Sequence, residues 1–233
     1  MQAIASLRGS MPKRKYTPLA PVKTQPPINP LSRTVGAPDV QRDQCPQPTV
    51  HNIVCTSQIR SDGPIDLAAL SKLLPFSFYD KQRFAAATIR LHSPQTTALI
   101  FGSGKLVITG GRDYYECVLA SLCVSRILRD AFPSRSFHLI DCAIQNIVAH
   151  VCLDVGEGIL DLNAMYVKLE LNCMFQSSMF PGLVYRPEAS PVVLLCFFSG
   201  RIVVTGGRTI RDVYEGWEKL WPVVRVFIRD TNG

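Results

Sequence analysis

One stretch of this chain occurs twice, and that repetition constrains the fold more than any other feature. Residues 99–112 read LIFGSGKLVITGGR and residues 195–208 read LCFFSGRIVVTGGR, with nine of the fourteen positions identical. Each copy has the pattern of a strand, a tight Ser-Gly turn, a second strand and a Gly-Gly break. The offset of 96 residues is too long for a solenoid repeat and matches half a domain. We therefore expect two copies of one unit related by a pseudo-twofold axis.

The N-terminal segment differs in composition from the rest. Nine of the 17 prolines fall in residues 1–48, with +5 of the net charge of +7 and few large apolar side chains. Such a segment buries too little apolar surface to offset the entropy lost on ordering, so we predict a disordered, Pro-rich basic tail over residues 1–47. Within it, PKRK at residues 12–15 fits a nuclear-import signal or an ordinary solvated basic segment equally well.

The composition of the remaining chain excludes several function classes. Hydrophobic residues make up 47% of the sequence, but no run of 18 uncharged apolar residues occurs, so we expect a packed core and no membrane segment. The eight cysteines form neither a CxxC pair nor a Cys/His cluster, which predicts buried, reduced thiols with no metal and no cofactor. The four histidines belong to no catalytic motif, and we assign them no role. Neither an enzyme nor a small-molecule substrate is expected.

Each copy of the repeat predicts the order β–α–β–β–β–α. In the first copy the pattern indicates strands over 50–59, 84–91, 96–101 and 105–109, and helices over 67–74, capped by Asp66, and 112–132. In the second it indicates a strand over 137–154, a helix over 160–167, strands beginning at 180, 192 and 202, and a helix over 209–221 that Pro222 ends, before a closing strand over 223–228. We expect residues 48–136 and 137–233 to be the two repeats of one α+β domain.

The period of two along a strand sorts its side chains between two faces. If one face packs against the helices, the other is apolar, apart from an Asn and a Thr, with a basic residue at its margin. In the first repeat that face would carry Asn52, Val54, Leu99, Phe101, Val107 and Thr109. The second repeat repeats the same set as Asn146, Val148, Leu195, Phe197, Val203 and Thr205. An apolar face left open indicates a binding surface, and its twofold repetition indicates a long, quasi-symmetric ligand.

Duplex DNA read from its minor groove fits this surface. An Asn amide can donate to the acceptors on the groove floor, A N3 and T O2, and Val and Thr fit a groove that lacks the guanine amino group. Phe side chains can wedge between base steps, and flanking Lys or Arg side chains can contact phosphates. The alternative is that these phenylalanines are ordinary core residues, which their repetition on the Asn face disfavours.

Five long motifs of this chain resemble those of the TATA-binding protein family. They are QNIV (145–148), RFAAATIRL (83–91), TTALIFGSGKLVITG (96–110), MFPGLVYR (179–186) and VLLCFFSGRIVVTGG (193–207). The resemblance extends over about residues 48–230 and implies a saddle, in which one curved antiparallel sheet carries its helices on the convex face. Kinking of the minor groove is known from this family itself, so that element of the mechanism is implied by the resemblance.

The resemblance also implies residue roles. It pairs Phe84 with Phe101 and Phe180 with Phe197 as intercalating wedges, and it assigns the sets on the open face, with Asn52 and Asn146 at the centre, to the groove. Phosphate contacts would come from Arg90, Lys105, Arg112, Arg186, Arg201 and Arg208. The implied function is that of a nuclear general transcription initiation factor, which binds promoter DNA and nucleates a preinitiation complex with other transcription factors.

Departures from the family pattern occur mainly where partner proteins are expected. The glutamine before the first Asn is replaced by His51, and an acidic loop that meets general transcription factor IIB is replaced by residues 176–179 (QSSM). Apolar or small residues replace basic ones at Val118, Leu122, Cys123, Ala189 and Pro191. We therefore predict a divergent TATA-binding protein or a related factor with altered partner contacts. Two alternatives stay open: a scaffold that partner proteins recruit to promoters with little TATA specificity of its own, and an inhibitory paralogue.

Overall fold

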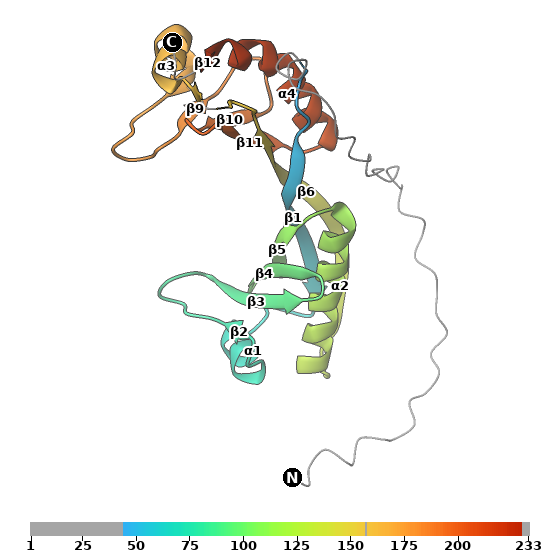
Figure 1. The fold of residues 1–233 in the computed structure, drawn as a ribbon. Helices are drawn as coiled ribbons and strands as arrows, with labels where there is room; N and C mark the ends of the chain where they lie inside the picture. The colour runs from blue at the N-terminus through green and yellow to red at the C-terminus, as the bar shows by residue number, and fades with distance from the viewer. Residues whose placement is uncertain (1–43, 157, 230–233) are drawn as a thin grey trace. The chain divides into compact units, whose positions relative to one another are not determined.

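The computed structural model describes residues 44–156 and 158–229, which belong to one compact unit spanning residues 40–233 (Figure 1). Most of the tail predicted over residues 1–47 lies outside the described residues, and its disorder stays a prediction. No helix within the described ranges has the length and apolar character needed to cross a membrane.

The first repeat follows the predicted order, with one short strand added. Asp66 caps the first helix as expected, because its carboxylate accepts a hydrogen bond from the backbone N–H of Ala69 at 2.9 Å. The elements are β1 (Thr49–Ser61), α1 (Leu67–Leu73), β2 (Ser77–Phe78), β3 (Ala86–His92), β4 (Gln95–Phe101), β5 (Lys105–Gly111) and α2 (Tyr114–Ala131). The added strand, β2, has only two residues, too few for a period-two pattern to reveal it.

The second repeat has the same elements and two further short strands. They are β6 (Phe137–Cys152), β7 (Ile159–Leu160), α3 (Leu162–Leu169), the 3-10 turn η2 (Glu170–Asn172), β8 (Cys173–Met174), β9 (Leu183–Tyr185), β10 (Val193–Cys196), β11 (Arg201–Gly207), α4 (Ile210–Val224), η3 (Arg225–Phe227) and β12 (Ile228–Arg229). The predicted boundaries of the two repeats, at residues 48, 136 and 137, stay predictions.

Two predictions at the end of the chain were wrong. Pro222 does not end the last helix but lies inside α4, and the strand expected over residues 223–228 is reduced to β12, which pairs with β7. A proline removes one helical hydrogen bond, here the bond to the carbonyl of Glu218, an exposed residue. Burial of Val224 keeps the final turn helical against the core.

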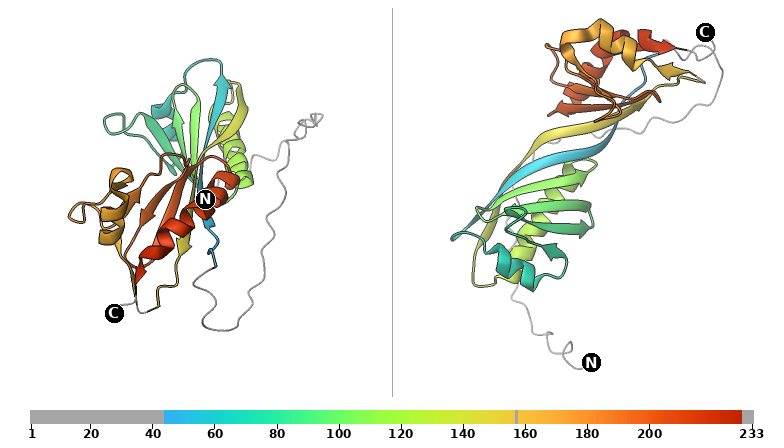
Figure 2. Two further views of the ribbon diagram at one scale, coloured as in Figure 1. Left: turned by 90° about the horizontal axis from the view of Figure 1, so that it is seen from above. Right: turned by 90° about the vertical axis from the view of Figure 1, so that its left-hand side faces the viewer.

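Ten strands form one antiparallel sheet whose order is symmetric about its centre. The order is β2-β3-β4-β5-β1-β6-β11-β10-β9-β8, so β1 and β6 are the two middle strands (Figures 1 and 2). Each repeat contributes five consecutive strands, and the pairing of Asn52 with Val148 and of Val54 with Asn146 joins them. This arrangement confirms the predicted fold class.

The core lies between one face of the sheet and the helices. Alternate strand residues such as Ile53, Ile100 and Leu106 are at most 2% exposed and belong to one cluster with the inner faces of the helices. From α2 this cluster takes Cys117, Ala120, Val124 and Leu128, and from α4 it takes Val213, Trp217, Leu220, Trp221 and Val224. Burial of an apolar side chain of this size contributes about 1.5–3 kcal/mol, so the sheet face and the helices stabilise each other.

Each long helix is also hydrogen-bonded to a segment of the opposite repeat. The Tyr114 hydroxyl of α2 donates to the carbonyl of Cys142 in β6 at 2.9 Å, and the Tyr214 hydroxyl of α4 donates to the carbonyl of Pro48 at 3.0 Å. The Trp217 indole N–H donates to the carbonyl of Pro46, in the segment just before the first repeat, at 2.6 Å. The two repeats are therefore joined by the helices as well as by the sheet.

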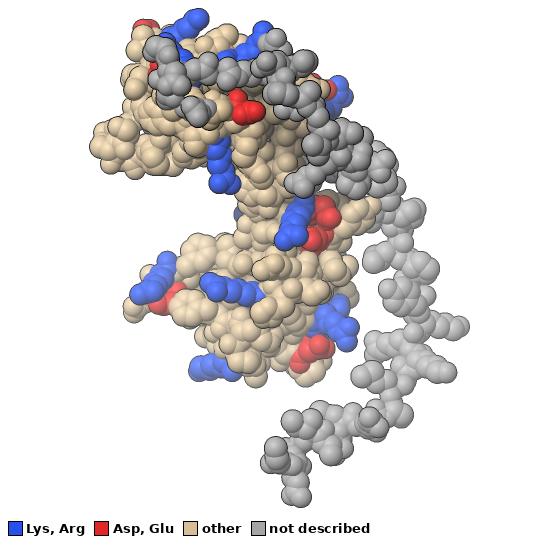
Figure 3. Space-filling view, in the orientation of Figure 1, with Lys and Arg blue, Asp and Glu red and all other residues tan. Residues whose placement is uncertain are grey.

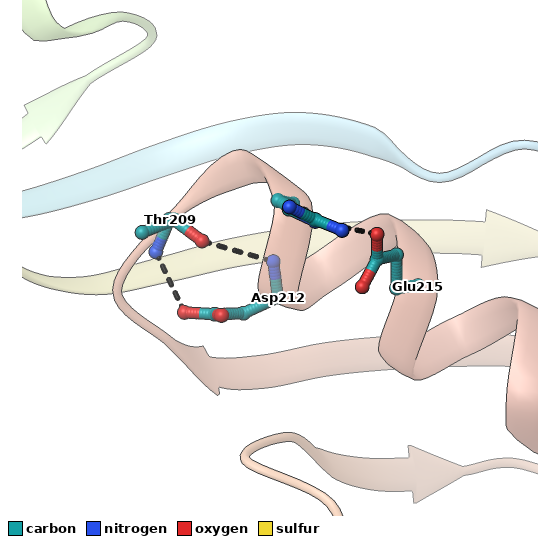
Figure 4. A network of polar contacts seen from close by, with 4 residues as sticks. Thr209, Asp212 and Glu215 are labelled. Atoms are coloured by element: carbon teal, nitrogen blue, oxygen red, sulfur yellow. Dashed lines mark hydrogen bonds and ion pairs between the residues drawn. The ribbon is translucent and has the colours of Figure 1, made fainter.

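The N-terminus of α4 is closed by a capping box (Figure 4). The Thr209 hydroxyl accepts from the backbone N–H of Asp212 at 3.0 Å, while the Asp212 carboxylate accepts from the backbone N–H of Thr209 at 2.9 Å. One turn further, Arg211 and Glu215 form an exposed ion pair. The cap satisfies helix N–H groups that have no partner within the helix.

Replacement of the capping threonine is expected to destabilise the protein. Thr209→Ala removes one half of the box and should lower the free energy of unfolding by about 1 kcal/mol, measured by urea denaturation. Arg211→Ala is the matched control, because an exposed ion pair of this kind contributes only about 0.3–0.5 kcal/mol. Equal effects of the two substitutions would contradict the role of the cap.

Candidate nucleic-acid interface

The sheet face opposite the helices has no covering layer among the described residues. The strand residues that alternate with the core are all partly exposed: Asn52, Val54, Leu99, Phe101, Val107 and Thr109 in the first repeat and Asn146, Val148, Leu195, Phe197, Val203 and Thr205 in the second. We call this surface the open face. The structure thus brings together both sets that the period of two predicted. Most of these side chains are apolar, so covering the face would be favourable.

Register shifts beside each central asparagine orient its side chain. Between β1 and β5 the ladder shifts after Ile53, and Gly110 sits in the irregular stretch with φ of +95°. Its N–H donates to Asn52 Oδ1 at 2.8 Å, and the Thr109 hydroxyl lies 3.4 Å from the same oxygen. A backbone N–H only donates, so the amide oxygen must face it. The Asn52 amino group has no partner among the described residues and is free to donate.

The second repeat reproduces this geometry at Asn146. The ladder between β11 and β6 shifts after Val204, and Gly206, with φ of +101°, donates its N–H to Asn146 Oδ1 at 2.8 Å. Here the amino group also lies 3.1 Å from the Thr205 hydroxyl, which leaves one amino N–H unused. Both asparagines therefore present a hydrogen-bond donor near the centre of the sheet.

The four phenylalanines form two pairs, as the resemblance implied. The ring centroids of Phe84 and Phe101 lie 5.9 Å apart, and those of Phe180 and Phe197 lie 5.7 Å apart, both edge to face. The outer rings are the more open, with Phe84 49% and Phe180 39% exposed. A Cβ at Gly182 would lie 2.8 Å from the Phe180 ring, so this glycine makes room for the pair.

The six basic residues predicted to contact phosphates are all exposed. None takes part in an ion pair between described residues, whereas other arginines, such as Arg126 with Asp130, are paired. Lys105 and Arg201 begin β5 and β11, and Arg112 and Arg208 follow the glycines that end these strands. Figure 3 shows Lys and Arg scattered over a mostly uncharged surface, several of them beside Asp or Glu. These cations remain available to an anionic ligand.

Two side chains on the open face were missed by the sequence reasoning. His51 and Gln145 are the residues that the β1–β6 ladder skips at its register shifts. His51 lies against His150, with ring centroids 5.3 Å apart, and Gln145 donates to the Thr56 hydroxyl at 2.8 Å. A strict period of two places His51 and Gln145 on the helix side, and only the bulges bring them to open-face neighbours.

The described residues hold no group of three or more potential metal-ligating side chains. All eight cysteines are free, but they are not uniformly buried as predicted, since Cys152 is exposed near the end of β6. Hydrogen bonding from Cys55 lowers the pKa of Cys142 to about 6, despite partial burial. Cys55 belongs to the buried core, and Cys142 packs against it.

Comparisons with known proteins agree with this architecture. The model of the family described as "Transcription factor TFIID (or TATA-binding protein, TBP)" matches the chain twice, over residues 47–131 and 141–227. A solved structure described as Methanococcus jannaschii TBP is similar with a TM-score of 0.62 at 28% identity, covering 78% of this chain and 99% of that one.

Several relatives are about one-third identical to this chain over the aligned residues. TATA-box-binding protein 2 of Arabidopsis thaliana is 37% identical over 181 residues, which cover 77% of this chain and 86% of the relative. TATA-box-binding protein of Candida albicans is 34% identical over 77% of this chain and 73% of its own length. TATA box-binding protein-like 2 of Takifugu rubripes is 35% identical over 77% of this chain, and the match spans about half, 54%, of that relative.

The bulge glycines allow a matched pair of substitutions. Gly110→Ala and Gly206→Ala both force a side chain into a positive φ, which costs about 1–3 kcal/mol. At Gly206 the new Cβ would also lie 2.8 Å from the Pro191 carbonyl oxygen, whereas at Gly110 the nearest atom is 3.5 Å away. We therefore expect the Gly206 variant to lose more stability in chemical denaturation. A larger loss for the Gly110 variant would contradict the geometry.

Proposed function

The chain belongs to the TATA-binding protein family, and on that premise we propose that it is a general transcription initiation factor that binds promoter DNA through the minor groove, kinks it and nucleates a preinitiation complex. The observation that carries the proposal is the open face itself. Two Phe pairs and two oriented asparagines occur on it at equivalent positions of the two repeats. The proposed role requires a nuclear location.

The asparagine geometry supports a preference for A·T base pairs. Each amide oxygen is occupied by a backbone N–H, so the groups left to meet the groove floor are donors. The floor of an A·T minor groove offers only acceptors, A N3 and T O2, whereas a G·C pair adds the guanine amino donor. A donor facing a donor would leave both unpaired. The flanking Val54, Val148, Val107 and Val203 offer the guanine amino group no acceptor.

The aromatic pairs support kinking. A ring that enters a base step must compensate for lost stacking, and a pair of rings in edge-to-face contact offers a rigid apolar wedge at low entropy cost. The pairs belong to opposite repeats, one at the β4 side and one at the β10 side of the sheet. Two kinks separated by the central strands would bend the duplex around the open face.

Removal of a wedge should weaken and straighten the complex. Phe101→Ala and Phe197→Ala are each expected to cost about 1–3 kcal/mol of binding, roughly tenfold to a hundredfold in Kd, by analogy with base–aromatic stacking. Fluorescence anisotropy with a TATA-containing duplex measures the affinity, and energy transfer between its labelled ends measures the bend. Phe76→Ala is the control, because Phe76 is 47% exposed and lies outside both pairs. Unchanged bending in both wedge variants would rule out the kinking mechanism.

The exposed cations should make binding depend on salt. If six phosphates are contacted, log K should fall with log salt at a slope of roughly −5, and Arg201→Ala should reduce that slope by about 1. Arg126→Ala is the matched control, since Arg126 is exposed on α2 and paired with Asp130. An equal slope for the native chain, the Arg201→Ala variant and the Arg126→Ala variant would show that Arg201 does not contact a phosphate.

A second candidate function, a scaffold recruited by partner proteins, is favoured by one observation. Helix α2 exposes an apolar stripe at helical spacing, with Tyr115 59%, Leu119 50% and Leu122 42% exposed. Such a stripe on a solvent-facing helix fits a protein partner. The two functions differ in one measurement: under the scaffold function the purified chain would not bind the duplex until a partner is added. DNA binding by the chain alone that Leu119→Glu leaves unchanged favours the first function.

A further inference from the structure

His51 and His150 form a pair on the open face that the predicted site does not use. His150 is paired with Val203 across β6 and β11, so it lies beside a residue of the proposed groove-contacting set. His51 is the bulge residue of β1, and its ring lies 5.3 Å from that of His150, between centroids. His51 is exposed and His150 is half-buried. Both imidazoles thus sit within the surface that the nucleic acid would cover.

The equivalent positions on the other half of the open face carry neutral side chains. With an offset of 94 residues, His51 corresponds to Gln145 and His150 corresponds to Thr56. Gln145 and Thr56 are also in contact, through a hydrogen bond of 2.8 Å, and Thr56 is paired with Val107 as His150 is with Val203. The two halves of the open face therefore have the same architecture here, but only one of them can change its charge near neutral pH.

The surroundings of His51 disfavour its charged form in the free protein. Burial, His150 of β6 and Arg201 of β11 lower the pKa of His51 from its usual value of 6.5, and no carboxylate contributes. The Nδ1 atom of His150 is buried and has no hydrogen-bond partner within residues 44–156 and 158–229. The groups facing the pair are therefore basic or neutral, and an imidazolium at this place lacks an anionic partner from the protein.

We propose that His51 and His150 are a proton-linked contact to nucleic acid, in which the imidazolium form binds backbone phosphate beside Arg201 and the protein takes up protons as it binds. This inference rests on the proposed function, because it requires DNA on the open face. A bound phosphate would supply the negative charge that no carboxylate of the protein supplies to His51. The half of the open face beside β11 then holds DNA more strongly at low pH, whereas the Gln145–Thr56 contact, in the half beside β5, does not change its charge with pH.

The direction of the pH effect follows from linkage. A phosphate stabilises the imidazolium, so the pKa of His51 is higher in the complex than in the free protein. Affinity is lowest at pH values above the pKa of the complex and rises as the pH falls through it. The gain is complete below the pKa of the free protein, which for His51 lies under its usual value of 6.5. Each histidine contributes at most a tenfold change per pH unit.

The test replaces the two histidines by the residues at the equivalent positions on the other half of the open face. Affinity of the full chain for a TATA-containing duplex is measured by fluorescence anisotropy between about pH 8 and about pH 5.5, at constant ionic strength, a range that spans the usual histidine pKa. The native chain should gain roughly tenfold in affinity towards low pH. The double variant His51→Gln, His150→Thr should bind at high pH and lose that gain. His92→Gln, at the exposed end of β3, should keep it.

Calorimetry of the native chain gives an independent readout that needs no variant. Binding in buffers of different ionisation enthalpy should show proton uptake near pH 6.5 and none near pH 8. Equal pH slopes for the native chain and the double variant, or binding without proton uptake, would overturn the inference while leaving the proposed function intact. Absence of binding at every pH would overturn both.

Discussion

The antiparallel pairing of β1 with β6 is the interaction on which the rest of the structure depends. These strands are the longest in the sheet, and their pairing joins its two five-stranded halves. Their register sets Asn52 opposite Val148 and Val54 opposite Asn146, which places both asparagines at the centre. Helices α2 and α4 stabilise this pairing on the helix side of the sheet, where the hydroxyls of Tyr114 and Tyr214 donate hydrogen bonds to backbone carbonyls. A shift of one residue would turn every one of these side chains to the opposite face.

The pairing is irregular, and its irregularities change which side chains the open face carries. Bulges beside Gly110 and Gly206 bring a backbone N–H to each asparagine oxygen, so the amide orientation is decided by main-chain geometry. The bulges within β1 and β6 add His51 and Gln145 to the open face. A regular ladder would have left the face more apolar and its asparagines free to rotate. The structure therefore gains polar specificity at points where the sheet loses hydrogen bonds.

The two repeats have diverged on both surfaces of the sheet. On the open face, a titratable His pair occupies the place of a neutral Gln–Thr contact. On the helix side, α2 presents an apolar stripe around Leu119, whereas α4 presents charged residues such as Arg211 and Glu215. Such differences make the two halves of a quasi-symmetric molecule distinguishable, because the two ends of a bound duplex would contact different side chains.

Much of the fold could be predicted because duplication and strand periodicity are local properties of the sequence. The repeated stretch around Phe101 and Phe197, the alternation of Leu106 with Val107 and the Asp66 cap are all decided within a few residues, and the structure agrees with each. Only the tertiary structure decided the positions of His51 and Gln145, since a bulge depends on how one strand meets its partner. It also decided that α4 continues past Pro222, because the burial of Val224 outweighs one lost hydrogen bond. Sequence determined which residues alternate; packing determined where that alternation is broken.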